Sequence, residues 1–183
     1  MTRPAYGVPV TLFLAGVILA VYAAELAGAV DTIAAGFIPA SPTFRGAFLS
    51  VFLHDPDNIA HVAGNLVFLV LFGTVLEPVI GSLRFLIFYG SAGSAGIALH
   101  WCVDPTSTHT LVGASGAIFG VMAVAAVIQP RLLGFAIGFM ILNIWYAFHG
   151  NEGISFGCHV GGFVAGVLEA ASLKLQGELT EEA

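Results

Sequence analysis

Ser115 and His159 are the two residues of this sequence that could together carry out nucleophilic chemistry. Each lies about five residues inside an apolar segment, and polar side chains at membrane depth are costly enough that they usually mark a function. An imidazole beside a serine hydroxyl can take its proton and so activate the oxygen as a nucleophile. The pair therefore predicts a serine nucleophile and its general base inside a membrane protein.

Two further polar residues, His61 and Asn65, are four positions apart and so lie on one face of a predicted helix. With a rise of about 1.5 Å per residue, all four side chains are expected roughly 4–10 Å below the same membrane face. Each has a structural alternative. A membrane serine often bonds to helix backbone, a histidine can be a core residue, a proton relay or a metal ligand, and His61 with Asn65 could join helices.

The composition indicates the class of protein. Hydrophobic residues make up 58% of the 183 residues and charged residues only 9%, against about 25% in soluble domains. With a mean hydropathy of +0.96, the chain is expected to be an all-α, multi-pass membrane protein. A helix needs about 20 apolar residues to cross the hydrocarbon. Six stretches come near this length and predict a six-transmembrane-helix bundle that forms one domain over residues 1–183: 8–30, 59–79, 83–101, 110–129, 131–149 and 154–173.

The few charges predict an orientation, because Lys and Arg near span ends stay on the cytoplasmic side. With the N-terminus inside, four cations fall inside, namely Arg3, Arg84, Arg131 and Lys174, and only Arg45 falls outside. Five loop acids fall outside: Asp31, Asp55, Asp57, Asp104 and Glu152. Both termini are therefore predicted to be cytoplasmic, with a short acidic tail at 174–183. The net charge of −6, without a basic stripe, argues against nucleic-acid binding.

The first apolar segment has an alternative interpretation as a secretory signal peptide, because Arg3 precedes the run and small residues follow it at 27–29. The run is longer than the apolar h-region of a usual signal peptide, so we interpret it as the first span. Glu25, near its outer end, is expected to be solvated. Residues 31–58 are the least apolar region and are expected to form an outer loop with a half-buried piece at 44–53.

Glycines recur at close spacing in the segments 83–101, 110–129 and 154–173, which lets helix backbones touch. Such contact between the last two segments would bring Ser115 to His159. Gly113 and Gly116, beside the serine, are also expected to leave room for a substrate backbone.

Four motifs follow one another along the chain: Phe52-Leu53-His54 followed by His61-Val62-Ala63-Gly64-Asn65; Glu77 with Gly81 and Arg84-Phe85; Gly113-Ala114-Ser115-Gly116-Ala117-Ile118-Phe119-Gly120; and His159-Val160-Gly161-Gly162-Phe163-Val164-Ala165-Gly166. Together they make the chain similar to the rhomboid intramembrane serine proteases, from about Arg45 to Glu169. G-x-S-G alone is a weak signal, and it lacks the strand-turn-helix context of soluble hydrolases. Four motifs in the family order are much more specific.

The resemblance implies a Ser115/His159 dyad that hydrolyses peptide bonds in or near transmembrane segments of membrane-protein substrates, through an acyl-enzyme. No Asp or Glu lies near His159 in its segment, so packing would have to hold the imidazole. In the family an aromatic ring at the position of Phe119, more often Tyr, stacks on the histidine. His61, Asn65 and the backbone N–H of Ser115 are implied to stabilise the oxyanion. The expected partners are transmembrane substrates and the lipid bilayer, with no cofactor, and the expected location is the plasma membrane with the active site open to the extracytoplasmic side.

Some features depart from the family pattern or lie outside it. The interval from His54 to His61 is longer by a residue or two than the common spacing, and Phe44-Arg45 is the nearest match to a frequent Trp-Arg pair. His54 resembles a position that stabilises the outer loop. The other histidines, His100, His109 and His149, lie at predicted interfaces without H-E-x-x-H spacing, so no metal site is predicted. Cys102 and Cys158 both fall in the outer half, which leaves a disulfide open.

Two rival functions would use the same residues. A non-catalytic rhomboid-like protein would bind membrane clients without cutting them, although such relatives typically lack the serine or the histidine. A small transporter or proton relay could use the buried histidines, but the sequence has no paired half-repeats. Neither rival accounts for the four ordered motifs.

Overall fold

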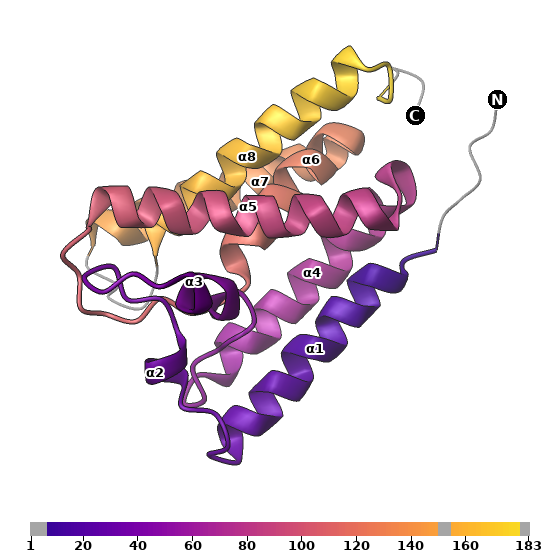
Figure 1. The fold of residues 1–183 in the computed structure, drawn as a ribbon. Coiled ribbons are helices and arrows are strands. Elements are labelled where there is room, and N and C mark those ends of the chain that lie inside the picture. The colour runs from indigo at the N-terminus through magenta and orange to yellow at the C-terminus, as the bar shows by residue number, and fades with distance from the viewer. Residues whose placement is uncertain (1–6, 150–154, 180–183) are drawn as a thin grey trace.

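The computed structural model describes residues 7–149 and 155–179 as a bundle of helices (Figure 1). Its elements in chain order are α1 (Pro9–Leu26), α2 (Thr32–Ala35), α3 (Phe44–Ser50), α4 (Ile59–Ile80), α5 (Ser82–Val103), α6 (Ser115–Ile128), the 3-10 helix η1 (Pro130–Leu132), α7 (Leu133–Phe148) and α8 (Phe156–Leu175). Within these described residues, extended pairing is limited to one isolated bridge between Phe37 and Leu111. The all-α prediction is therefore confirmed. Arg3, Glu152 and residues 180–183 of the acidic tail lie outside the described residues.

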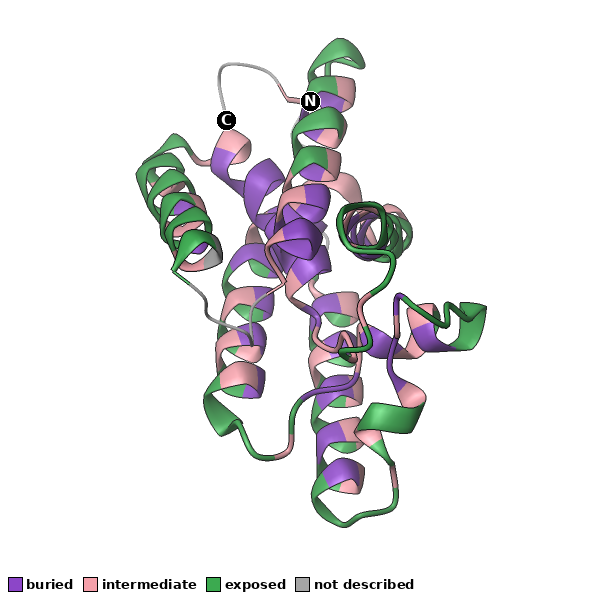
Figure 2. Ribbon diagram, turned by 90° about the vertical axis from the view of Figure 1, so that its left-hand side faces the viewer, coloured by how far each residue is buried: buried purple, intermediate pink, exposed green. Residues whose placement is uncertain are grey.

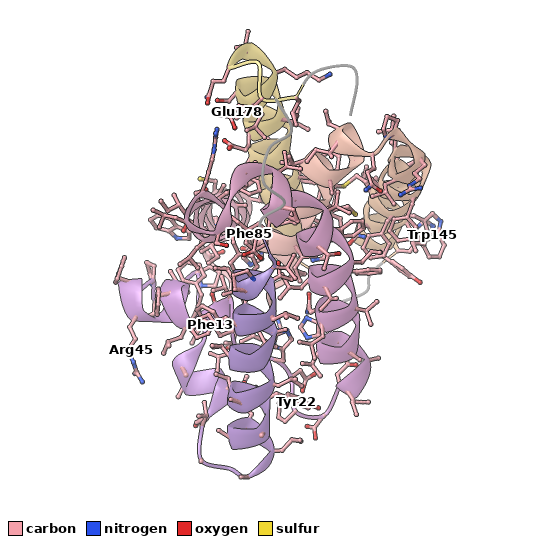
Figure 3. All side chains as sticks on the ribbon, turned by 90° about the vertical axis from the view of Figure 1, so that its right-hand side faces the viewer. Phe13, Tyr22, Arg45, Phe85, Trp145 and Glu178 are labelled. Atoms are coloured by element: carbon pink, nitrogen blue, oxygen red, sulfur yellow. The ribbon has the colours of Figure 1, made fainter. Side chains whose placement is uncertain are left out.

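Among the described residues, four helices are long and apolar enough to cross a membrane, namely α1, α4, α5 and α8. The apolar helices that correspond to the predicted spans 110–129 and 131–149 are shorter. Exposed residues lie on the outer faces of the bundle (Figure 2), and many of them are apolar. Phe13 and Trp145, labelled in Figure 3, are 63% and 51% exposed. An apolar surface of this extent is typical of a protein that contacts membrane.

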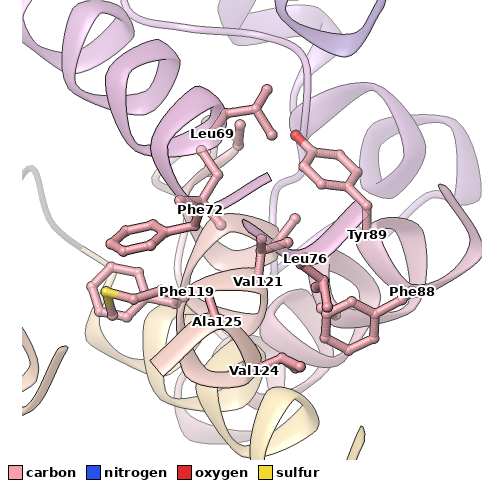
Figure 4. Close-up of a cluster of buried hydrophobic side chains, with 14 of the residues drawn as sticks. Leu69, Phe72, Leu76, Phe88, Tyr89, Phe119, Val121, Val124 and Ala125 are labelled. Atoms are coloured by element: carbon pink, nitrogen blue, oxygen red, sulfur yellow. The ribbon is translucent and has the colours of Figure 1, made fainter. Parts of the chain in front are cut away.

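α6 lies in the middle of the bundle, where it contacts α4, α5, α7 and α8. Its residues from Gly116 to Ala126 are all buried, as expected for a helix that is apolar on every side. Figure 4 shows part of this core, in which α6 meets α4 and α5: Phe119, Val121, Val124, Leu69, Phe72, Leu76, Phe88 and Tyr89. α6 therefore provides a rigid central support for whatever its first residues carry.

α6 begins at Ser115, whereas the sequence predicted a span from residue 110. Residues 110–114 are not helical. Leu111 exchanges backbone hydrogen bonds of 2.7 and 3.1 Å with Phe37, and Gly113 has a φ of 124°, which no helix permits. Apolar composition does not distinguish an extended segment beside protein from a helical turn in lipid. Ser115 is thus the first residue of its helix rather than lying about five residues inside it.

Glycines allow α6 and α8 to touch along their backbones. A Cβ at Gly162 would collide with the carbonyl of Gly116, and a Cβ at Gly166 would collide with the carbonyl of Gly120. Side chains larger than hydrogen at these points would force the helices apart. The glycine spacing in the sequence therefore indicated the correct helix pair, and this contact brings the N-terminal ends of α6 and α8 together.

One end of the bundle, which we call the Glu77 end, gathers the start of α1, the end of α4 and the start of α5. The fully buried Glu77 carboxylate accepts hydrogen bonds of 2.6–2.9 Å from the backbone N–H groups of Val10 and Thr11 and from the hydroxyls of Thr11 and Ser82. A carboxylate at a helix N-terminus satisfies backbone donors that the helix leaves unpaired and complements its dipole. Glu77 therefore fixes α1 against α4 and α5.

Arg84 joins the end of α8 to the Glu77 end. Its Nε lies 3.0 Å from Glu169 and its Nη1 lies 2.8 Å from Glu178, the residue labelled at the top of Figure 3. These pairs are partly exposed and contribute about 0–1 kcal/mol each in water. Arg45, in contrast, projects from α3 (Figure 3), so Arg45 and Arg84 lie in different parts of the molecule.

The opposite end of the bundle, which we call the His54 end, gathers the end of α1, the start of α4, α2 and α3. Glu25 accepts the backbone N–H of His54 at 3.0 and 3.2 Å and the hydroxyl of Thr32 at 2.9 Å. Glu25 is only 5% exposed, so the expectation that it is solvated was wrong. The loop after α1 folds back over the carboxylate, and this loop includes α3 within the predicted half-buried piece at 44–53.

Candidate active site

Ser115 is half-buried at the N-terminal end of α6, and the segment before it fixes its position. The N–H of Gly113 donates to the carbonyl of Ser50 at 2.8 Å, which attaches this segment to the end of α3. The positive φ of Gly113 favours glycine because a Cβ would be strained there. That Cβ would also lie only 2.7 Å from Nε2 of His61. Glycine is therefore favoured at position 113 for two separate reasons.

The hydroxyl of Ser115 contacts the imidazole of His159. The distance from Oγ to Nε2 is 2.7 Å, which is the reach that general-base catalysis needs. His159 lies in the first turn of α8 and is 8% exposed. Ser155 caps α8 by accepting the N–H of Cys158 at 3.2 Å, and its hydroxyl lies 2.8 Å from Nδ1 of His100 in α5. The structure thus brings together the two residues that the sequence singled out.

Aromatic stacking holds the flat face of His159. The ring of Phe119, one turn after Ser115 in α6, lies 4.3 Å from the imidazole with an interplanar angle of 12°. Phe139 of α7 stacks on the other side of Phe119, at 5.3 Å and 15°. The stacking implied by the family resemblance for Phe119 is therefore present, although Phe stands where Tyr is more common.

The edge of His159 opposite the serine contacts a residue that the sequence analysis missed. Oδ1 of Asn143, on α7, lies 2.6 Å from Nδ1 of His159, and Asn143 is 4% exposed. Asn143 is an amide on a different helix, so the absence of an acid near His159 in its own segment gave no sign of it. The available signal was Asn143 itself, a polar amide in the otherwise apolar segment 131–149.

His61 and Asn65 lie on the same side of the site, one turn apart in α4. His61 is half-buried beside Gly113, with its ring 5.1 Å from that of His54. Asn65 is buried, and its Nδ2 donates to Nε2 of His54 at 3.0 Å and to the carbonyl of His61 at 3.1 Å. Both amide hydrogens of Asn65 are therefore already in use.

His54 is fully buried between α1 and α4, outside the helices. Its Nε2 faces Asn65 and its Nδ1 lies 3.2 Å from the carbonyl of Phe52. Burial, together with the neighbouring ring of His61, lowers the pKa of His54 to about 4, so this imidazole is neutral at physiological pH. These contacts support a structural role for His54 in the outer loop.

Several of these side chains line one cavity of about 350 Å³. Its polar lining includes His61, Asn65, Ser115, Asn143 and His159, and Phe68, Phe119 and Phe139 supply much of its apolar lining. Hollows of about 630 and 690 Å³ lie between the outer loops and beside α3, but their described linings do not combine a serine with a histidine. The chemistry of the lining, rather than its size, identifies the smaller cavity as the candidate active site.

Gly116 faces another helix. A Cβ at this position would lie 2.6 Å from Sγ of Cys158 in α8, so the interpretation that Gly116 leaves room for substrate is replaced by one of helix packing. Cys158 and Cys102 both carry free thiols. No cluster of three or more His, Cys, Asp or Glu side chains that could hold a metal occurs in the part of the chain that the structure describes.

Comparison with known proteins identifies the family to which this chain is similar. The rhomboid domain family matches residues 41–175. Over 126 residues the chain is 34% identical to the rhomboid protease GluP of Bacillus subtilis (strain 168), a stretch that is 64% of this chain and 24% of that protein. Over 88 residues it is 31% identical to the chloroplastic Rhomboid-like protein 11 of Arabidopsis thaliana, or 48% of this chain and 30% of that protein. The matched stretches thus span less than a third of either relative. The family match covers most of the chain and includes both Ser115 and His159, and we conclude that this chain belongs to the rhomboid family.

Proposed function

We propose that this protein is an intramembrane serine endopeptidase that hydrolyses peptide bonds in or near the transmembrane segments of membrane-protein substrates. The observation that carries the proposal is the 2.7 Å contact between Oγ of Ser115 and Nε2 of His159 inside an apolar helical bundle. The similarity to the rhomboid protease GluP adds independent support.

In the proposed reaction, Nε2 of His159 takes the hydroxyl proton of Ser115 while Oγ attacks the scissile carbonyl carbon. The tetrahedral intermediate then collapses. Its C–N bond breaks, the imidazolium returns the proton to the leaving amine, and an ester remains on Ser115. Water, deprotonated by the same imidazole, attacks this ester, and the proton passes back to Oγ as the acid product leaves. The two side chains therefore end as they began.

We assign oxyanion stabilisation to the backbone N–H of Ser115 and to the side chains of His61 and Asn65. The first N–H groups of a helix lack partners within it, and the helix dipole favours negative charge there. Ser115 occupies this position in α6. Asn65 donates to His54 and to the carbonyl of His61 in the resting structure, so it must exchange one of these bonds for the oxyanion.

We further propose that α6 and α7 cross the membrane with the other long helices, giving six spans with both termini in the cytoplasm. The gathering of helix ends at a Glu77 end and a His54 end supports alternating directions. With the His54 end outside, the site opens to the extracytoplasmic face of the plasma membrane. A substrate helix hides its carbonyls in hydrogen bonds, so it must unwind locally before attack.

Cleavage of tagged single-pass membrane proteins in liposomes tests this function. We expect the wild-type protein to cut, and Ser115→Ala and His159→Ala to be inactive. Ser94→Ala is a matched control, because Ser94 is an exposed serine of α5 whose hydroxyl donates to the helix carbonyl of Gly90. Cutting that survives Ser115→Ala contradicts the proposal. A wild-type protein that binds a panel of substrates without cutting any of them would favour the client-binding alternative.

A further inference from the structure

We infer that Asn143 is the positioning residue of the general base, so that the site works as a serine–histidine–asparagine triad completed by α7. The inference rests on the proposed function and deepens it. The central observation is the 2.6 Å contact between Oδ1 of Asn143 and Nδ1 of His159, between two side chains that are 4% and 8% exposed. No acid is required for this arrangement, because an amide oxygen can accept the same hydrogen bond.

The backbone of α7 fixes which end of the Asn143 amide faces the histidine. Nδ2 of Asn143 lies 2.9 Å from the carbonyl oxygen of Phe139, one turn earlier in the helix. A carbonyl oxygen only accepts hydrogen bonds, so the NH₂ group must point at Phe139. The oxygen of the amide then points at His159.

This orientation sets the tautomer of the imidazole. Oδ1 of Asn143 has no hydrogen to donate, so Nδ1 of His159 must carry the proton. A neutral imidazole has one N–H, which leaves Nε2 with a free lone pair towards Oγ of Ser115 at 2.7 Å. A chain of contacts from the Phe139 carbonyl to the Ser115 hydroxyl therefore prepares Nε2 to accept the serine proton.

The neighbouring pair of Asn65 and His54 shows the opposite arrangement. There the amide nitrogen faces the histidine, because Nδ2 of Asn65 donates both to Nε2 of His54 and to the carbonyl of His61. His54 must then carry its proton on Nδ1, towards the carbonyl of Phe52. In both pairs a helix carbonyl orients the asparagine, but only Asn143 leaves a histidine nitrogen free to accept a proton from serine.

α7 holds the general base from two directions. Asn143 contacts the edge of the imidazole, and the ring of Phe139, four residues earlier on the same helix face, backs the Phe119 ring that covers the imidazole face. Edge and face contacts together leave the ring little freedom to rotate. When Nε2 takes the serine proton, Nδ1–H keeps its bond to Asn143, so the base stays aligned to protonate the leaving amine.

Variants of residue 143 test the inference in the cleavage assay. Asn143→Leu keeps a similar size but removes the acceptor, and we expect kcat to fall about 10–100-fold, as for the loss of one buried hydrogen bond, with KM nearly unchanged. Asn143→Asp keeps an oxygen at Oδ1 whether or not it is protonated, so it is expected to restore kcat to within about tenfold of the wild-type value. Ile141→Ala, which truncates a 60% exposed side chain of the same helix, is the control for general perturbation of α7.

A direct measurement on the unmodified protein keeps the inference testable if Asn143→Leu fails to fold. Nitrogen NMR of histidine-labelled protein, with the His159 signals assigned by difference from His159→Ala, is expected to show the proton on Nδ1. A proton on Nε2, or an Asn143→Leu enzyme with wild-type kcat, overturns the inference while Ser115→Ala remains inactive. If the wild-type protein neither cuts membrane-protein substrates nor reacts with a fluorophosphonate at Ser115, the proposed function fails and the inference fails with it.

Discussion

Gly113 approaches His61 so closely that a Cβ at position 113 would lie 2.7 Å from Nε2 of the imidazole. This close approach places the segment before Ser115 against the first turns of α4. It also places a proposed oxyanion donor beside the residue that leads into Ser115. The site therefore depends on a backbone conformation and a close approach that only glycine combines.

Gly113→Ala is expected to lower both stability and activity. The φ of 124° costs roughly 1–3 kcal/mol for a residue with a Cβ, and overpacking against His61 adds about 1–3 kcal/mol. Thermal unfolding and cleavage rates measure the two effects. Gly90→Ala in α5 is the control, since a Cβ there meets nothing within 4 Å. A Gly113→Ala enzyme with wild-type stability and kcat would contradict this account of the segment.

Removal of the Cys158 thiol is expected to rescue Gly116→Ala. The added Cβ would lie 2.6 Å from Sγ, so the single variant should lose about 1–3 kcal/mol of stability. The double variant with Cys158→Ala should be more stable than the sum of the two single effects predicts. The difference should be a coupling energy of about 0.5–3 kcal/mol, the range found for residues in contact. Purely additive effects on unfolding would show that the two residues do not share this contact. A stable but inactive double variant would return Gly116 to a role in substrate approach.

Protonation of His54 is expected to destabilise the His54 end in acid. Its pKa is about 4 in the folded protein and about 6.5 when unfolded, so the unfolded state binds more protons between these values. Stability should therefore fall as pH drops from 6.5 towards 4. His54→Gln keeps an acceptor for Asn65 but does not titrate. The difference in unfolding free energy between wild type and this variant should shrink as pH drops through that window, and a difference independent of pH would contradict the assignment.

His61→Ala is expected to lower kcat alone, whereas Asn65→Ala is expected to lower both kcat and stability. Loss of one oxyanion donor typically costs about 2.7–4 kcal/mol of transition-state stabilisation, or about 10²–10³ in kcat. His61→Ala should show this loss with little change in thermal stability. Asn65→Ala should lower kcat and also stability, because Asn65 bonds to the buried ring of His54. Full activity of Asn65→Ala would remove this residue from the oxyanion site.

The sequence was sufficient to identify contacts that depend on local spacing. Phe119 lies one turn after Ser115 and shares its face, and the glycines of α6 and α8 indicated the helix contact that brings His159 to the serine. Helix periodicity places Phe119 on the face of Ser115, and the small size of glycine indicates the helix contact, whereas the stacking of Phe119 on His159 was implied by the family resemblance.

The remaining features of the site depend on contacts between distant segments. Asn143 reaches His159 from a different helix, and one polar residue in an apolar run does not reveal its partner. Glu25 is buried because a later loop returns over it. The predicted start of α6 was wrong because residues 110–113 are largely apolar yet not helical, a state to which the pairing of Leu111 with Phe37 contributes. Composition and period do not carry this long-range information.

The most direct test of the central claim is the reaction of the purified protein with a fluorophosphonate, followed by mass spectrometry of the peptide that contains Ser115. Activation by His159 predicts a phosphonyl adduct on Oγ of Ser115, with fluoride as the leaving group. Labelling should be absent in Ser115→Ala and slower by about 10²–10⁴-fold in His159→Ala, the usual contribution of a general base. An adduct on another residue, or equal labelling rates of Ser115 in wild type and His159→Ala, would contradict the account.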